Sequence, residues 1–297
     1  MKTLSKTILN TVLKKADIYL VVTGIFSYLL GCAVADFLGN SLAIDLCLLG
    51  LFLLFSIYVS FLIVGYYFEE AQIGSNLRTD QKSRLQLNLT LALIAFALLV
   101  NAFLIFLIQQ KRQLTLESWL FLAAFFIFSF ILKMPKLKRV LNPFSLFIKA
   151  FLVSGLIPAI SLLLQGFELN RLIPLLAFPL FFLHSACSLA RSFSNYANDL
   201  SKNRRSTLVT LGWEKGIFFH NVMVLFAFLL LGLGPLFGLA WKITWPALTL
   251  GIVGLFQIFQ LQKIAQGAKP NWLLLNWTAL ILYAITVYML LFAFFIY

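Results

Sequence analysis

The 297-residue sequence predicts an all-α fold, a polytopic transmembrane helical bundle of about nine spans. Hydrophobic residues make up 62% of the chain and charged residues 11%, which lies far outside the range of soluble domains. Apolar runs of about 18 or more residues recur from end to end, each long enough to cross a bilayer as a helix. The runs are continuously apolar rather than alternating, which argues against barrel strands.

The elements follow from run length and from polar interruptions. In residues 1–16, apolar residues at helical spacing are surrounded by lysines, which predicts an amphipathic helix on the membrane surface. Residues 17–297 are expected to form one transmembrane domain. Its predicted spans are 17–35, 43–67, 86–108, 116–132, 144–165, 172–190, 216–240, 243–261 and 272–296.

The basic residues support this count and give an orientation. With the N-terminus placed in the cytoplasm and nine alternating spans, 19 Lys and Arg residues fall on the cytoplasmic side and four on the other. Such a bias is the positive-inside pattern of a multi-pass protein in a cell or inner membrane. The net charge of +13 sits in short loops between spans. It therefore indicates contact with anionic lipid or an anionic substrate, and not with nucleic acid.

The cysteines and histidines give no sign of a metal or disulfide framework. Cys32, Cys47 and Cys187 all lie in apolar runs, and their odd number implies no pairing, so we expect small buried residues. His184, in the sixth predicted span, is expected to form a helix–helix hydrogen bond. With no second histidine near it in the sequence, it indicates neither zinc nor haem.

Polar chemistry is concentrated in the segment from Arg191 to Gly212, RSFSNYANDLSKNRRSTLVTLG. Asn195 and Asp199 are four residues apart and would share one helix face. Asp199 is one of only ten acidic residues in the chain and lies close to membrane depth. Three cations follow directly: Lys202, Arg204 and Arg205. A carboxylate beside cations at the end of an apolar helix predicts a site for a metal-bound anion such as a diphosphate.

This segment resembles the second motif of the UbiA family of membrane prenyltransferases, D-x-x-x-D-x-x-x-x-G-x-x-T/S with a closing glycine. Laid on it, the two aspartates of the motif fall on Asn195 and Asp199. With the rest of the motif shortened by one residue, its hydroxyl residue falls on Ser206 and its inner glycine is replaced by Asn203, and the closing glycine matches Gly212. The basic tail of the motif matches Arg204 and Arg205.

Two further family motifs are recognisable in other loops. The first motif, N-D-x-x-D-x-x-x-D, would fall on the segment GYYFEEAQI, where its middle aspartate is Glu69 and its last is Ile73. The proline- and lysine-rich segment P-P-x-x-L-K is similar to Pro135, Lys136, Leu137 and Lys138, with one residue fewer between proline and leucine. The resemblance thus spans the whole predicted topology, although the first motif has lost acids.

The resemblance implies a bundle of roughly nine helices, embedded in membrane lipid, that uses Mg²⁺ as a cofactor. Such a protein transfers an isoprenoid chain from a prenyl diphosphate to a small hydrophobic or aromatic acceptor. The resemblance also implies Asp199, Asn195 and Glu69 as metal ligands, with Asp199 and Glu69 as the catalytic carboxylates. Mg²⁺ prefers oxygen ligands and would stabilise the leaving diphosphate. The residues implied to bind diphosphate oxygens are all basic: Lys136, Lys138, Lys202, Arg204 and Arg205.

Other interpretations remain open at this point. Asp199 could be a solvated carboxylate paired with Lys202, Glu69 and Glu70 could be an ordinary interfacial pair, and the Lys133–Arg139 cluster could serve topology alone. The loss of acids also fits a non-catalytic protein that binds an isoprenoid or a partner on the same scaffold. A small transporter is a weaker possibility, because paired helix-breaking positions in two inverted halves are not evident.

Overall fold

The structure is a computed structural model that describes residues 17–39, 41–74 and 81–297. Within these ranges it does not describe the side chains of residues 72–74, 81–84, 136, 138 and 139. The amphipathic helix predicted for residues 1–16 lies outside the described residues.

Helices account for nearly all of the described chain, which contains no strand. The long helices are α2 (Ile18–Phe37), α3 (Ile44–Gly74), α4 (Gln81–Lys111), α5 (Leu116–Ile131), α9 (Leu172–Ser192), α12 (Trp213–Leu233), α14 (Gly251–Ala265) and α15 (Trp272–Ile296). The shorter elements are α6 (Pro135–Leu141), η1 (Asn142–Phe144), α7 (Ser145–Phe151), η2 (Leu152–Leu156), α8 (Ile157–Leu164), η3 (Phe193–Asn195), α10 (Tyr196–Ser201), α11 (Thr207–Leu211), η4 (Gly234–Phe237) and α13 (Trp241–Leu248).

These elements confirm the predicted fold class and form the bundle of a multi-pass integral membrane protein. Eight helical segments of the described chain are long and apolar enough to cross a membrane. The fourth predicted span is α5, an apolar helix of 16 residues that falls just short of that length. All nine segments predicted as spans are therefore helical, with α3 reaching further than predicted, to Gly74.

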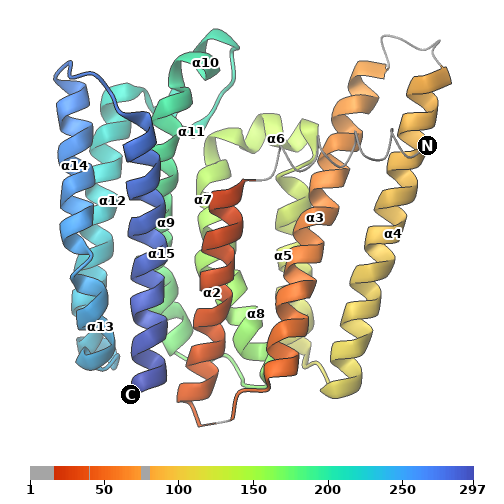
Figure 1. The fold of residues 1–297 in the computed structure, drawn as a ribbon, viewed down its shortest axis with the longest axis horizontal. Helices are drawn as coiled ribbons and strands as arrows, with labels where there is room; N and C mark the ends of the chain where they lie inside the picture. The colour runs from red at the N-terminus through yellow and green to blue at the C-terminus, as the bar shows by residue number, and fades with distance from the viewer. Residues whose placement is uncertain (1–16, 40, 75–80) are drawn as a thin grey trace.

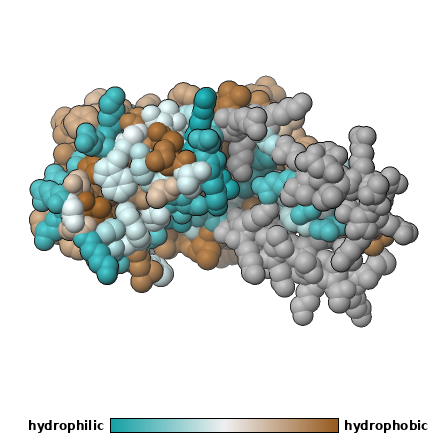
Figure 2. All heavy atoms as spheres, turned by 90° about the horizontal axis from the view of Figure 1, so that it is seen from above, coloured by the Kyte–Doolittle hydropathy of each residue, from teal (hydrophilic) through white to brown (hydrophobic). Residues whose placement is uncertain are grey.

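The helices run up and down side by side, with the short helices α6, α10 and α11 at one end and α8 and α13 toward the other (Figure 1). Helix α2 packs mainly against α15 and α8, α9 packs against α12 and α15, and α3 packs mainly against α4. The elements α6, α10 and α11 lie at the end where α2 begins, which we call the polar end, and the C-terminus lies at the opposite end (Figure 1). Seen from above, the polar end carries hydrophilic residues framed by apolar ones (Figure 2).

The fifth predicted span is interrupted in its middle. The turn of π-helix η2 separates α7 from α8, and Pro158 is the second residue of α8. Proline has no backbone N–H and disturbs the helix before it, so a widened turn at this point is expected. The carbonyl of Pro158 lies so close to α2 that a Cβ on Gly31 would be 2.3 Å from its oxygen. Glycine at position 31 therefore allows α2 and α8 to meet backbone to backbone.

Candidate functional site

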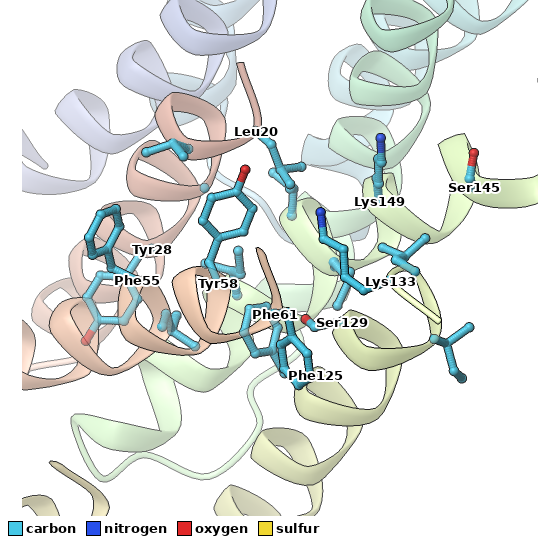
Figure 3. Close-up of a pocket in the computed structure, with 18 of the residues that line it drawn as sticks. Leu20, Tyr28, Phe55, Tyr58, Phe61, Phe125, Ser129, Lys133, Ser145 and Lys149 are labelled. Carbon is cyan, nitrogen blue, oxygen red and sulfur yellow. The ribbon is translucent and has the colours of Figure 1, made fainter. Parts of the chain in front are cut away.

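A cavity of about 230 Å³ lies between α2, α3, α5 and the segment from α7 to α8. Its lining is mostly apolar and includes five aromatic rings that Figure 3 labels: Tyr28, Phe55, Tyr58, Phe61 and Phe125. Along α2 it extends from Leu20 to Tyr28, a rise of about 12 Å. The cavity therefore starts at the polar end and reaches into the apolar part of the bundle.

The polar end of this cavity carries two lysines. Lys133 follows the end of α5, Lys149 lies on α7, and their amino groups point the same way in Figure 3. Among the described residues that line the cavity, none is Asp or Glu. A cavity that is apolar along its length and cationic at its mouth suits an amphiphile with an anionic head.

The position of Lys133 depends on the neighbouring helix α3. A Cβ placed on Gly65 would lie 3.4 Å from Cδ of Lys133, so the lysine stem runs close along α3 at this glycine. The Lys133 ammonium lies 6.0 Å from the centre of the Tyr58 ring. The Tyr58 hydroxyl accepts a hydrogen bond of 3.0 Å from the backbone N–H of Asp17. The start of α2 is thereby fixed beside the lysine.

A second, smaller cavity of about 130 Å³ adjoins the first, because Leu20, Ser145 and Lys149 line both. Arg191 lines this second cavity, forms a half-buried ion pair with Asp17 at 3.2 Å, and stacks over the ring of Tyr19 at 4.3 Å. The two cavities together therefore bring Lys133, Lys149 and Arg191 to one region, against the single acid Asp17 among their described lining residues.

His184 lies in the second cavity and differs from the expectation of a helix–helix hydrogen bond. Its Nδ1 is 3.4 Å from Oγ of Ser188, one turn later on the same helix, and its buried Nε2 has no hydrogen-bond partner in the described structure. Its contacts with other helices are through rings, with centroids 5.2 Å from Tyr19 and 4.9 Å from Tyr283. A buried unpaired ring nitrogen beside a cavity leaves a position for a polar group of a ligand.

The residues predicted as metal ligands lie elsewhere at the polar end. Asp199 is half-buried on α10 and is 3.9 Å from Arg204, while Asn195 ends η3 with its side chain exposed. Glu69 is exposed near the end of α3. None of the three lines either cavity. In Figure 1 the end of α3 lies well to one side of α10, with α6 between them.

This placement bears on the predicted Mg²⁺. Within the described ranges, no three His, Cys, Asp or Glu side chains come close enough to hold a metal ion. The acids of the described ranges therefore form no cluster, and the Mg²⁺ assignment stays a prediction.

The predicted diphosphate-binding residues divide into two groups. Lys202, Arg204 and Arg205 are exposed in the connection between α10 and α11. Lys136 and Lys138 belong to α6, but their side chains lie outside the described part of the chain. Neither group lines the cavities as described, so their role also stays a prediction.

Sequence reasoning missed the residues that do line the cavities. Lys149 entered only as one of the 19 basic residues on the cytoplasmic side, although it lies in the predicted span 144–165, where a cation is costly and marks function. The ion pair between Arg191 and Asp17 joins residues 174 positions apart, so no local sequence pattern predicts it.

The comparisons with known proteins bear on the fold. No protein-family profile and no curated protein sequence matches this chain. A solved structure reported as digeranylgeranylglyceryl phosphate synthase in membranes is similar to it, with a TM-score of 0.64. The alignment covers 99% of this chain and 98% of that chain at 17% sequence identity. The chain therefore shares the fold of that synthase over nearly its whole length.

Proposed function

We propose that this protein is an integral-membrane prenyltransferase that moves an isoprenoid chain from a prenyl diphosphate to an acceptor. The isoprenoid chain would occupy the apolar cavity, and the diphosphate would lie at Lys133 and Lys149. The observation that carries this proposal is the cavity itself, apolar along α2 and α3 and lined by lysines where it opens. The resemblance to the UbiA motifs and the likeness of fold support it.

The proposed reaction needs positive charge beside the diphosphate that leaves. When the bond between the allylic carbon and the diphosphate oxygen breaks, negative charge develops on that oxygen and positive charge on the carbon. Fixed cations at the mouth would stabilise the leaving group, and an apolar, water-poor cavity would strengthen that interaction. The aromatic rings deeper in the cavity would hold the chain by packing.

Mg²⁺ is proposed as the cofactor on the resemblance alone, with Asp199, Asn195 and Glu69 as its ligands. Bound there, it would neutralise diphosphate oxygens. Because the described acids form no cluster, the lysines and Arg191 are the groups to which we assign charge stabilisation.

The acceptor is proposed to enter through the second cavity, which shares Lys149 with the first. A small hydrophobic or aromatic acceptor is the class implied by the resemblance. The similar structure bears the name of a glyceryl phosphate synthase, so a phosphate-bearing lipid belongs in the same panel of candidates. With the N-terminus in the cytoplasm, as the charge bias predicts, both cavities would open toward the cytoplasmic side.

Transfer is tested with purified protein in lipid nanodiscs, geranylgeranyl diphosphate and each acceptor class, with Mg²⁺ or with EDTA. We expect diphosphate release coupled to a prenylated product, and a strong loss of both in Lys149→Gln. Lys111→Gln is the matched control, because Lys111 is an exposed lysine paired with Asp45 at the opposite end of the bundle. Product formation that is unchanged in Lys149→Gln would contradict the assignment of the mouth.

A non-catalytic isoprenoid-binding protein is the second candidate, and one observation favours it. Among the described residues, no three acidic side chains lie close enough together to hold a metal ion, whereas basic side chains line both cavities. This candidate predicts saturable binding of the prenyl diphosphate that survives EDTA, with no diphosphate release for any acceptor. The same nanodisc sample distinguishes the two, since binding and turnover are measured on one preparation.

A further inference from the structure

Two of the three cysteines meet inside the bundle. Sγ of Cys32, on α2, lies 2.9 Å from Sγ of Cys47, on α3, and both residues are buried. Sγ of Cys32 also lies 3.0 Å from Oγ of Ser161 on α8. A disulfide bond has an S–S length of about 2.0 Å, so the two sulfur atoms need to approach by less than about 1 Å. We propose that Cys32 and Cys47 form a modification site that takes up a reversible disulfide.

The site lies away from both cavity mouths. Cys32 is near the end of α2 and Cys47 is near the start of α3, so both flank the short connection between these helices. That connection lies at the end of the bundle opposite α6 and α10 (Figure 1). In the orientation predicted from the basic residues, this is the outward side, where disulfides form and persist.

The surroundings hold the first thiol in place. Neighbouring Gly31 lets α2 approach the Pro158 carbonyl of α8, and Ser161 is one turn further along α8. Cys32 is therefore fixed between two helices, while Cys47 is the more exposed of the pair, at 7% against 1%. The reaction would begin at Cys47 for this reason.

The reaction balances with a disulfide oxidant. The Cys47 thiol loses its proton and attacks the oxidant, which releases one equivalent of thiol and leaves a mixed disulfide on Cys47. The Cys32 thiol then displaces the second equivalent and forms the Cys32–Cys47 bond. Two protein thiols are oxidised, and one oxidant molecule is reduced to two thiols.

The bond would join parts of the bundle that otherwise touch little. Helix α3 packs mainly against α4, and α2 packs mainly against α15 and α8. Tyr28 is one turn before Cys32 and lines the apolar cavity, and its hydroxyl lies against Gly50 of α3. A disulfide would thus fasten the α3 wall of the cavity to α2. This holds whichever ligand the cavity binds, so it does not rest on the proposed function.

The test uses 4,4′-dithiodipyridine, a small apolar aromatic disulfide, on the folded protein in nanodiscs. Cys187→Ser serves as the parent, since it removes the third buried cysteine, for which no thiol partner is described. We expect the parent to release two equivalents of thiopyridone and to end without a pyridyl adduct, with Cys32 and Cys47 in one disulfide-linked peptide. When Cys32→Ser is added to the Cys187→Ser parent, the protein should release one equivalent of thiopyridone and keep a stable pyridyl adduct on Cys47.

A second readout separates the disulfide from incidental reactivity. The oxidised parent should unfold at a higher temperature than its reduced form, and dithiothreitol should restore the lower value. Adducts on both Cys32 and Cys47 of the parent would overturn the proposal. So would a folded parent that does not react while its detergent-denatured form does.

Discussion

Gly24 offers the sharpest test of what the apolar cavity holds. It lines the cavity on α2, and the nearest atom to a Cβ placed there is Cδ1 of Ile157 at 3.5 Å, an ordinary contact. Alanine should therefore fit without strain, whereas the longer side chain of Gly24→Leu must project into the cavity. The structure thus predicts a graded series in which ligand affinity falls with the size of residue 24.

The expected loss follows from the cost of overpacking. A prenyl chain reaches the cavity from lipid, so excluding it loses little hydrophobic free energy, and the main penalty is steric. Overfilling a packed apolar site costs about 1–3 kcal/mol. That corresponds to roughly a 5- to 150-fold weaker affinity for geranylgeranyl diphosphate. A five-carbon prenyl diphosphate, whose chain stays near the lysines, should lose little.

Binding of both diphosphates is measured by titration in nanodiscs, with the thermal unfolding midpoint of each variant recorded to confirm folding. Gly232→Leu is the control, because a Cβ at Gly232 on α12 meets only Cδ2 of Leu248, at 3.9 Å. An equal loss for short and long chains, or an equal loss in the control, would refute a chain-binding role for this cavity.

Three further outcomes are expected. Lys149→Gln should weaken diphosphate binding by roughly 10- to 150-fold, the equivalent of one charge-assisted hydrogen bond of about 1.5–3 kcal/mol, in the same titration. Gly31→Ala should lower the free energy of unfolding by about 1–3 kcal/mol in detergent melts, because its Cβ would meet the Pro158 carbonyl, and an unchanged melt would contradict the contact. Asp199→Asn should cut Mg²⁺-dependent turnover by about tenfold or more, because it removes a charged metal ligand. The melting temperature should change little, because the ion-pair partner of Asp199, Arg204, is exposed. Unchanged turnover would show that Asp199 does not belong to the site.

Most of the fold could be predicted from the sequence, because a bilayer leaves few choices. Every apolar run became a helix, since backbone groups in lipid must be satisfied within a segment. The interior of the spans was less predictable. The π-turn η2 depends on a proline that enters a helix already packed against α2, and composition alone does not place it.

The site could be predicted only where its chemistry is local. Asn195, Asp199 and the arginines after them form a contiguous pattern, so the sequence located the polar end of the bundle. The cavity walls come from four separate parts of the chain, and Lys149 reaches the cavity only in the folded bundle. The Cys32–Cys47 contact likewise joins two spans, so counting cysteines could not reveal it.

The central claim is that an isoprenoid chain lies in the cavity between α2, α3 and α5 with its anionic head at the lysines. It is tested most directly with a geranylgeranyl diphosphate analogue that carries a diazirine at the end of the chain far from the diphosphate. After photolysis in nanodiscs, mass spectrometry should locate the label on cavity-lining peptides of α2, α3 or α5, and excess unlabelled diphosphate should abolish it. Label that falls mainly on α12, α14 or α15, or that persists under competition, would contradict the account.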